Sequence, residues 1–151
     1  TVLRMCDTHR RMFVTLASQL IREGKTDKAL KALDYCEKVI PSTTVPHDYI
    51  MSSSKEMADN YIKLGQQEKA ASILNHMANN SVEYITWYLS LDDARFASSY
   101  ENCMRHFYIL DDVCKSLANV KEGKEQESAA FHYTQKFEEL YKLLENRVGR
   151  K

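Results

Sequence analysis

The sequence predicts an all-α fold, and three observations lead to that prediction. First, the 151 residues include only four glycines and two prolines, which leaves few turns. Second, apolar residues recur at spacings of three and four over long stretches, as they do on one face of a helix. Third, the pattern between Phe13 and Pro41 returns 41 residues later, around Gly65. The sequence therefore predicts a helix–turn–helix unit that occurs twice.

The first unit has clear start and stop signals. A helix over residues 2–23 is expected to end at Gly24, because glycine accepts the left-handed conformation that follows many helices. Thr26 or Asp27 is the expected N-cap of the second helix. Pro41 stops that helix, since proline lacks the amide hydrogen that a helix interior needs.

The second unit repeats these signals with a longer second helix. Asp48 is the expected cap of a helix over residues 49–64, although the serines at 52–54 are poor helix formers. Gly65 ends this helix as Gly24 ends the first. The chain could break at residues 79–81. No proline or glycine forces a break before residue 91, however, so the favoured prediction is one long helix, straight or kinked at residues 79–81.

The C-terminal part predicts a long helical hairpin. Asp92 or Asp93 caps its first helix, Gly123 breaks the chain, and residues 148–151 form a frayed tail. The apolar stripe of the first helix alternates steps of four and three, namely Phe96, Tyr100, Cys103, Phe107, Leu110, Cys114 and Leu117. The second helix carries a matching stripe of Ala130, Tyr133, Phe137, Leu140 and Leu144. Two such stripes joined by a short turn form an antiparallel pair.

Small residues occupy equivalent positions in the two N-terminal units. Ala17 and Ala58 lie on the first helices, and Ala29 and Ala70 lie on the second, so the helices of each unit can approach closely. A helix pair of this kind cannot bury both of its faces alone, and units therefore stack.

These residues resemble the tetratricopeptide repeat. The first unit matches at Phe13, Leu16, Ala17, Leu20, Gly24, Ala29, Leu33 and Pro41, and the second at Ala58, Tyr61, Gly65, Ala70 and Leu74. The resemblance implies one all-helical domain over residues 1–151, built as a right-handed stack. Its parts would be a first repeat (1–41), a second repeat with an extended second helix (47–91) and a helical hairpin (92–148).

A narrower resemblance concerns the order of the segments. The stretch 45–49, the second repeat, the aromatic stretch 84–91 and the final hairpin follow one another as in the C-terminal soluble region of a family of large bacterial membrane proteins. The N-terminal part of those proteins is multi-spanning and glycosyltransferase-like, and their function is poorly defined. The resemblance implies an accessory domain tethered to the inner membrane, on a side that the sequence does not reveal.

Charge excludes one class of partner. Lysine and arginine number 21, as do aspartate and glutamate, so the net charge is zero and nucleic acid is not an expected partner. No apolar run approaches the roughly 18 residues that span a bilayer, so we expect contact with a membrane only through a parent protein.

Metal binding and catalysis receive little support from the sequence. Cys6 with His9, and Cys103 with His106, each place a thiol and an imidazole one helical turn apart, a spacing that zinc sites use. Cys103, however, belongs to the apolar stripe, where a free thiol acts as a small hydrophobe. No third group that would orient a Cys–His pair is signalled. We therefore predict no catalytic residue, no metal and no cofactor.

Two surfaces are candidates for partner binding. By the resemblance, the first helix of each pair lines a concave groove. The groove positions would be Arg11, Val14, Ser18, Ile21 and Arg22 from the first unit and Ser52, Lys55, Asp59, Ile62 and Lys63 from the second. We choose Arg22, Lys55, Asp59 and Lys63 as the groove residues that would suit a partly acidic segment. Tyr84, Trp87 and Tyr88 form the second candidate, an aromatic platform, unless they pack in the core.

The leading functional hypothesis is a non-catalytic protein–protein interaction module that binds a protein or peptide. The alternative is a glycan-binding or small-ligand-binding domain that serves a membrane-embedded, glycosyltransferase-like part. Self-association or a spacer role is the third possibility. An exposed aromatic cluster would favour the ligand-binding hypothesis, because aromatic side chains are enriched at binding sites. A charged concave groove would favour peptide binding, and an extensive apolar convex surface would favour self-association.

Overall fold

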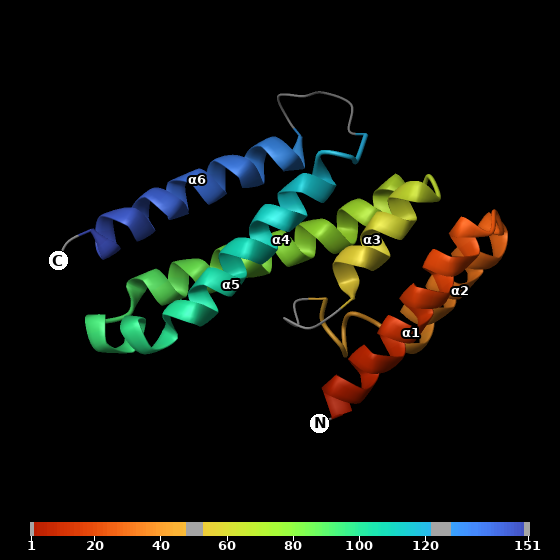
Figure 1. The fold of residues 1–151 in the computed structure, drawn as a ribbon, viewed down its shortest axis with the longest axis horizontal. Helices are drawn as coiled ribbons and strands as arrows, with labels where there is room; N and C mark the ends of the chain where they lie inside the picture. Colours follow the sequence, from red (N-terminus) through yellow and green to blue (C-terminus); the bar gives the residue numbers. More distant parts are fainter. Residues whose placement is uncertain (1, 48–52, 122–127, 150–151) are drawn as a thin grey trace. The chain divides into compact units, whose positions relative to one another are not determined.

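The computed structural model describes residues 2–47, 53–121 and 128–149, and in these ranges it contains six α-helices and no strand. The helices are α1 (Val2–Arg22), α2 (Thr26–Val39), α3 (Ser54–Lys63), α4 (Gln67–Ser90), α5 (Asp93–Leu117) and α6 (Ala129–Val148). Figure 1 shows them in chain order, with α1 and α2 side by side and α5 beside α6. The predicted all-α fold is confirmed.

The chain divides into two compact units, Thr1–Leu74 and Asn75–Lys151, and the boundary falls inside α4. In the first unit α1 packs against both α2 and α3. In the second unit α5 packs against α6, as the matching apolar stripes predict. α4 runs without a break through residues 79–81, so the prediction of one long helix is confirmed.

The two glycine turns have the same geometry. Gly24 and Gly65 have φ values of 73° and 75°, in the left-handed region. After α1 the amide of Lys25 donates to the carbonyl of Leu20, and after α3 the amide of Gln66 donates to the carbonyl of Tyr61, both at 2.8 Å. In each turn the glycine amide also donates to a carbonyl three residues back. This pattern is a Schellman motif, which closes a helix end and reverses the chain.

The small residues predicted to lie between the helices are fully buried. Ala17, Ala29, Ala58 and Ala70 have no exposed surface, and the same is true of Leu33 and Leu74, which are 41 residues apart. Because alanine side chains occupy the contacts, the helix backbones approach closely and leucines fill the remaining space. The first two hairpins are therefore built on equivalent core positions.

Two predicted helix starts differ from the structure. The N-cap of α2 is Lys25, without a side-chain capping bond, rather than Thr26 or Asp27. The Schellman turn places Lys25 directly before the helix, so the chain is already helical at Thr26. The predicted cap of the third helix, Asp48, and its predicted start lie outside the described residues. Within them α3 begins at Ser54, after an N-cap Ser53 that makes no side-chain capping bond.

A buried arginine organises the first unit. Arg10 on α1 has no exposed surface. Its guanidinium donates to the carbonyl oxygens of Val45 at 2.7 Å, Ile40 at 3.2 Å and Pro46 at 3.5 Å, and it pairs with Asp7 at 3.4 Å. These carbonyls follow the end of α2, where no helix supplies them with donors. Arg10 therefore fastens the segment after α2 to the middle of α1.

The second unit has the predicted cap and apolar seam of α5, and Ser128 is a further cap that was not predicted. Asp92 caps α5 by accepting from the amide of Arg95 at 2.9 Å, and Ser128 caps α6 by accepting from the amide of Phe131 at 3.1 Å. Six of the seven stripe residues of α5 are buried, and Tyr100 is the exception at 39% exposed. Tyr133 of α6 donates to the Asn79 side chain of α4 at 2.6 Å. The predicted break at Gly123 lies outside the described residues.

Substitution of the turn glycines tests the shared turn geometry. Gly24→Ala and Gly65→Ala are each expected to lower the free energy of unfolding by about 1 to 2 kcal/mol, because a Cβ disfavours the left-handed conformation. A Cβ at either site would meet no atom within 4 Å, so the cost comes from the backbone alone. Gly→Asn at the same sites should cost less, since asparagine tolerates this conformation. Urea denaturation would check the order, and alanine variants as stable as the asparagine variants would contradict it.

Candidate functional site

The predicted groove residues are only partly available for binding. Lys55 and Asp59 form an ion pair on α3 with a distance of 3.0 Å, and both side chains are partly buried. Arg22 and Lys63 are exposed in the last turns of α1 and α3, at positions 41 residues apart. A basic residue there interacts favourably with the negative end of the helix dipole. This interaction explains why basic residues occur at these two positions even if no partner protein binds them.

Two further groove positions prove to be structural. Val14 has no exposed surface, and its carbonyl accepts from the side-chain amide of Asn60 at 3.4 Å. The same amide donates to the hydroxyl of Ser18 at 3.0 Å. Val14 and Ser18 therefore lie at the contact between α1 and α3, and the prediction that they line an open groove is wrong. The reason is that α3 packs directly on this face of α1.

The predicted aromatic platform is exposed at two of its three residues. Trp87 is 54% exposed and Tyr84 is 41% exposed, whereas Tyr88 is buried. The Tyr84 ring stacks on His106 of α5, with centroids 4.6 Å apart and planes 11° from parallel. The Trp87 ring lies 5.0 Å from the ring of Tyr88. Tyr88 thus belongs to the core, and Tyr84 and Trp87 present aromatic surface beside it.

A surface hollow of about 250 Å³ accompanies these rings. It is lined by Asn80, Glu83, Tyr84 and Trp87. The four residues are spaced by three, four and seven along α4, so they share one face of the helix. Asn80 and Glu83 were not among the predicted site residues, although their spacing from the aromatic residues is readable in the sequence. The hollow combines two aromatic rings with a carboxylate and an amide.

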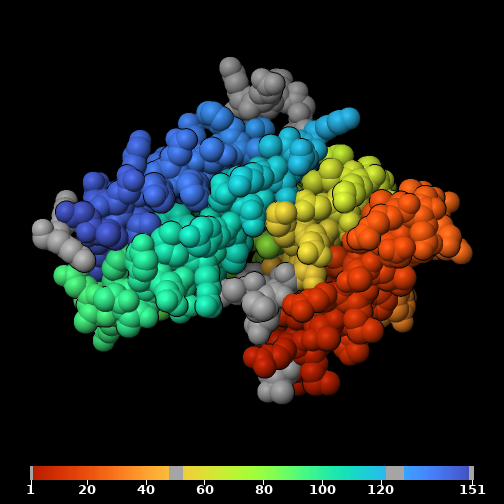
Figure 2. Space-filling view, viewed as in Figure 1, coloured from red at the N-terminus to blue at the C-terminus, as the bar shows by residue number. Residues whose placement is uncertain are grey.

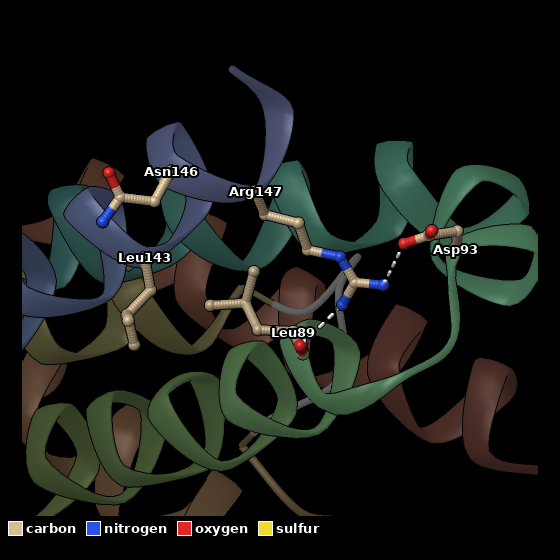
Figure 3. A pocket seen from close by; sticks show the side chains of 5 residues that line it. All are labelled: Leu89, Asp93, Leu143, Asn146 and Arg147. Atoms are coloured by element: carbon tan, nitrogen blue, oxygen red, sulfur yellow. Dashed lines mark hydrogen bonds and ion pairs between the residues drawn. The ribbon is translucent and has the colours of Figure 1, made fainter. Parts of the chain in front are cut away.

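A larger pocket of about 590 Å³ lies at the end of α4 (Figure 3). Arg147 of α6 donates to the carbonyl oxygens of Leu89, at 2.6 Å, and of Leu91, and it pairs with Asp93 at 3.3 Å. The guanidinium carbon also lies 4.1 Å from the centre of the Phe96 ring. The pocket is lined by Leu89, Asp93, Leu143, Asn146 and Arg147. Because Arg147 makes these contacts with the end of α4, we assign it a structural role.

The pair of Cys103 and His106 does not form an activated site. Cys103 and His106 are both buried in α5, and burial raises the pKa of the Cys103 thiol to about 11. A catalytic thiol needs the opposite shift, because the thiolate is the nucleophile. Among the described residues no group of three or more His, Cys, Asp or Glu side chains could hold a metal ion.

Comparison with known proteins finds no matching family model, no matching curated protein and no matching solved structure. Within the described ranges no helix has the length and apolar character needed to cross a membrane. Any function must therefore be argued from the surfaces described above.

Thiol reactivity tests the placement of the cysteines. At pH 8 we expect Cys6, which is partly exposed, to react rapidly with a thiol reagent, while Cys36, Cys103 and Cys114 react only on unfolding. Burial raises the pKa of Cys36, like that of Cys103, to about 11. The unfolded chain therefore loses these protons first, and stability should fall as the pH rises from about 9 to 11. Rapid labelling of Cys36 or Cys103 in the folded protein would contradict the structure.

Proposed function

We propose that this chain is a non-catalytic binding module and that the hollow on α4 binds a glycan or a comparable small polar ligand. One observation carries the proposal: Tyr84 and Trp87 are exposed side by side around a hollow that also contains Glu83 and Asn80. An exposed aromatic pair with a few polar groups is a combination found at ligand sites.

The chemistry of the hollow fits a saccharide. The C–H face of a sugar ring packs against an aromatic ring, and Trp87 offers the largest such surface. The carboxylate of Glu83 accepts hydrogen bonds from hydroxyl groups, and the amide of Asn80 both donates and accepts. Glu83 and Trp87 are four residues apart on α4, so these polar and aromatic groups reach the same ligand.

The site is also held in place before a ligand arrives. The stack of Tyr84 on His106 restricts the tyrosine ring, and the helical backbone fixes the spacing of all four residues. A preorganised site loses less conformational entropy on binding. Trp87 packs partly against the ring of Tyr88, which accounts for its buried portion. About half of Trp87 nevertheless remains exposed.

Protein binding through the basic helix ends is the second candidate. Arg22 and Lys63 expose a positive charge at equivalent places on α1 and α3, which would suit an acidic segment of a partner. Both proposals include the expectation that this chain belongs to a larger bacterial membrane protein, as the resemblance of the segment order implies. That expectation is compatible with a glycan ligand and with a protein partner.

A saccharide titration tests the α4 site. Trp87 is the only tryptophan in the chain, so its fluorescence reports directly on the hollow. We expect maltotriose or chitotriose to change the emission with a dissociation constant on the order of 1 mM, since the hollow is open and small. Glycerol, a polyol without a ring, should have no effect at the same concentration.

Two variants make the titration specific. Tyr84→Ala keeps the reporter and should weaken binding at least tenfold, whereas Tyr108→Ala, at a residue 67% exposed on α5, should leave it unchanged. Circular dichroism would verify that both variants are folded. Emission that is insensitive to every saccharide, or binding that is equal in the two variants, would refute the proposal.

A further inference from the structure

The first two hairpins offer an internal comparison. They share the glycine turn, the buried alanines and a register of 41 residues, so residues 12–22 of α1 have counterparts in the N-cap Ser53 and in residues 54–63 of α3. Equivalent positions should face equivalent surroundings unless something covers one hairpin and not the other. The exposure of these positions can therefore be compared directly.

In the second hairpin, the face of α3 that carries Met57 and Tyr61 is covered. Met57 and Tyr61 of α3 are fully buried. The Tyr61 hydroxyl lies 3.0 Å from the Asp34 carboxylate and 3.1 Å from the Glu37 carboxylate, both on α2. Lys69 at the start of α4 also pairs with Asp34, at 2.7 Å. The first hairpin is thus what covers this face of the second.

In the first hairpin the same face is open. Leu16, the counterpart of Met57, is 49% exposed, and Met12, the counterpart of the buried Ser53, is 62% exposed. Met5 lies on the same side of α1, seven residues before Met12, and is 60% exposed. On α2, Tyr35 is 55% exposed beside Phe13, with ring centroids 5.7 Å apart. We call the set Met5, Met12, Phe13, Leu16, Tyr35 and Val39 the open face.

The open face consists of several exposed apolar residues rather than of one. It spans two helices in contact, and Val39, one turn after Tyr35, is 45% exposed. Figure 2 shows α1, in red, at the molecular surface. A contiguous exposed apolar surface of this kind marks an interaction site.

Basic residues border the open face. Arg4 and Arg11 are exposed along α1, and Lys28, Lys31 and Lys38 are exposed along α2. Over residues 2–40 the chain has eight lysines and arginines against five aspartates and glutamates, an excess of three positive charges in a protein that is neutral as a whole. A partner that matches the face would carry acidic groups at its edges.

We propose that the open face docks an amphipathic α-helix of a partner protein whose apolar stripe is bordered by acidic residues. Helices cover the equivalent face of the second hairpin, so a helix is the element whose shape fits. The carboxylates Asp34 and Glu37 on the covering helix show that acidic residues are accommodated there. A second copy docking through the same face would bring two basic borders together, which opposes association. The surface is separate from the hollow on α4 and does not depend on it.

The test uses the full chain and two synthetic helical peptides with the same leucine stripe. One peptide has glutamates at the edges of the stripe and the other has lysines. By fluorescence anisotropy we expect the glutamate peptide to bind at least tenfold more tightly than the lysine peptide. That advantage should shrink as the salt concentration rises, because salt screens exposed charges.

Matched variants locate the site. Met12→Glu and Leu16→Glu, at exposed positions of α1, should weaken binding of the glutamate peptide at least tenfold. Tyr108→Glu on α5 is the control and should have no effect. Lys31→Glu keeps the apolar surface and should shift the preference toward the lysine peptide, so the charge argument stays testable if an α1 variant fails to fold. The double variant Arg22→Ala/Lys63→Ala should bind as the wild type does.

Several results would overturn the proposal. Equal binding of the two peptides would refute the role of the basic border, and no binding of either would refute a helical partner. If only Arg22→Ala/Lys63→Ala weakened binding, the site would be the basic helix ends instead. Sedimentation of the chain without peptide completes the test. If the wild type were a dimer and the Leu16→Glu variant a monomer, the occupant of the open face would be a second copy of the chain.

Discussion

The first unit depends on one buried charge. Burying a guanidinium is costly unless its hydrogen-bond donors find acceptors, and the two terminal nitrogens of Arg10 find them in the Asp7 carboxylate and in three carbonyls of the segment after α2. Those carbonyls in turn obtain the donors that the end of a helix lacks. The arginine thereby fixes where the chain leaves the first hairpin, and so where α3 meets α1. Arg147 acts similarly in the second unit, where it binds the carbonyls at the end of α4.

The packing of the helices determines which helix faces are buried and which stay exposed, and the candidate functions depend on the exposed faces. Once α3 packs on α1, Val14 and Ser18 become contact residues, and the groove expected there is reduced to the basic ends Arg22 and Lys63. The opposite side of the first hairpin remains uncovered and apolar. In the second unit, Tyr84 is stacked on His106 and the Trp87 ring lies beside Tyr88, and both Tyr84 and Trp87 remain partly exposed. The surfaces proposed to bind partners thus lie on helices rather than on loops.

The sequence predicted most of what local signals encode. Gly24 and Gly65 marked the turns because few other residues adopt a positive φ, and the seam of α5 was visible in its spacing. Arg10 was missed because its carbonyl partners are 30 to 36 residues away and nothing near it in the sequence marks it as buried. The aromatic platform was identified as a group, but periodicity alone could not separate buried Tyr88 from exposed Trp87, since that depends on α4 packing against α5.

Hydrogen exchange in an Arg10→Lys variant would test the central claim most directly, with Arg4→Lys as the matched control at an exposed site. Lysine keeps the charge but loses the planar fork of donors. The account predicts faster exchange of the Thr44 and Val45 amides, which donate to the carbonyl of Pro41, and of the α3 amides, while α5 and α6 keep wild-type protection. If Thr44 and Val45 exchanged at the wild-type rate, Arg10 would not be what holds the first unit together.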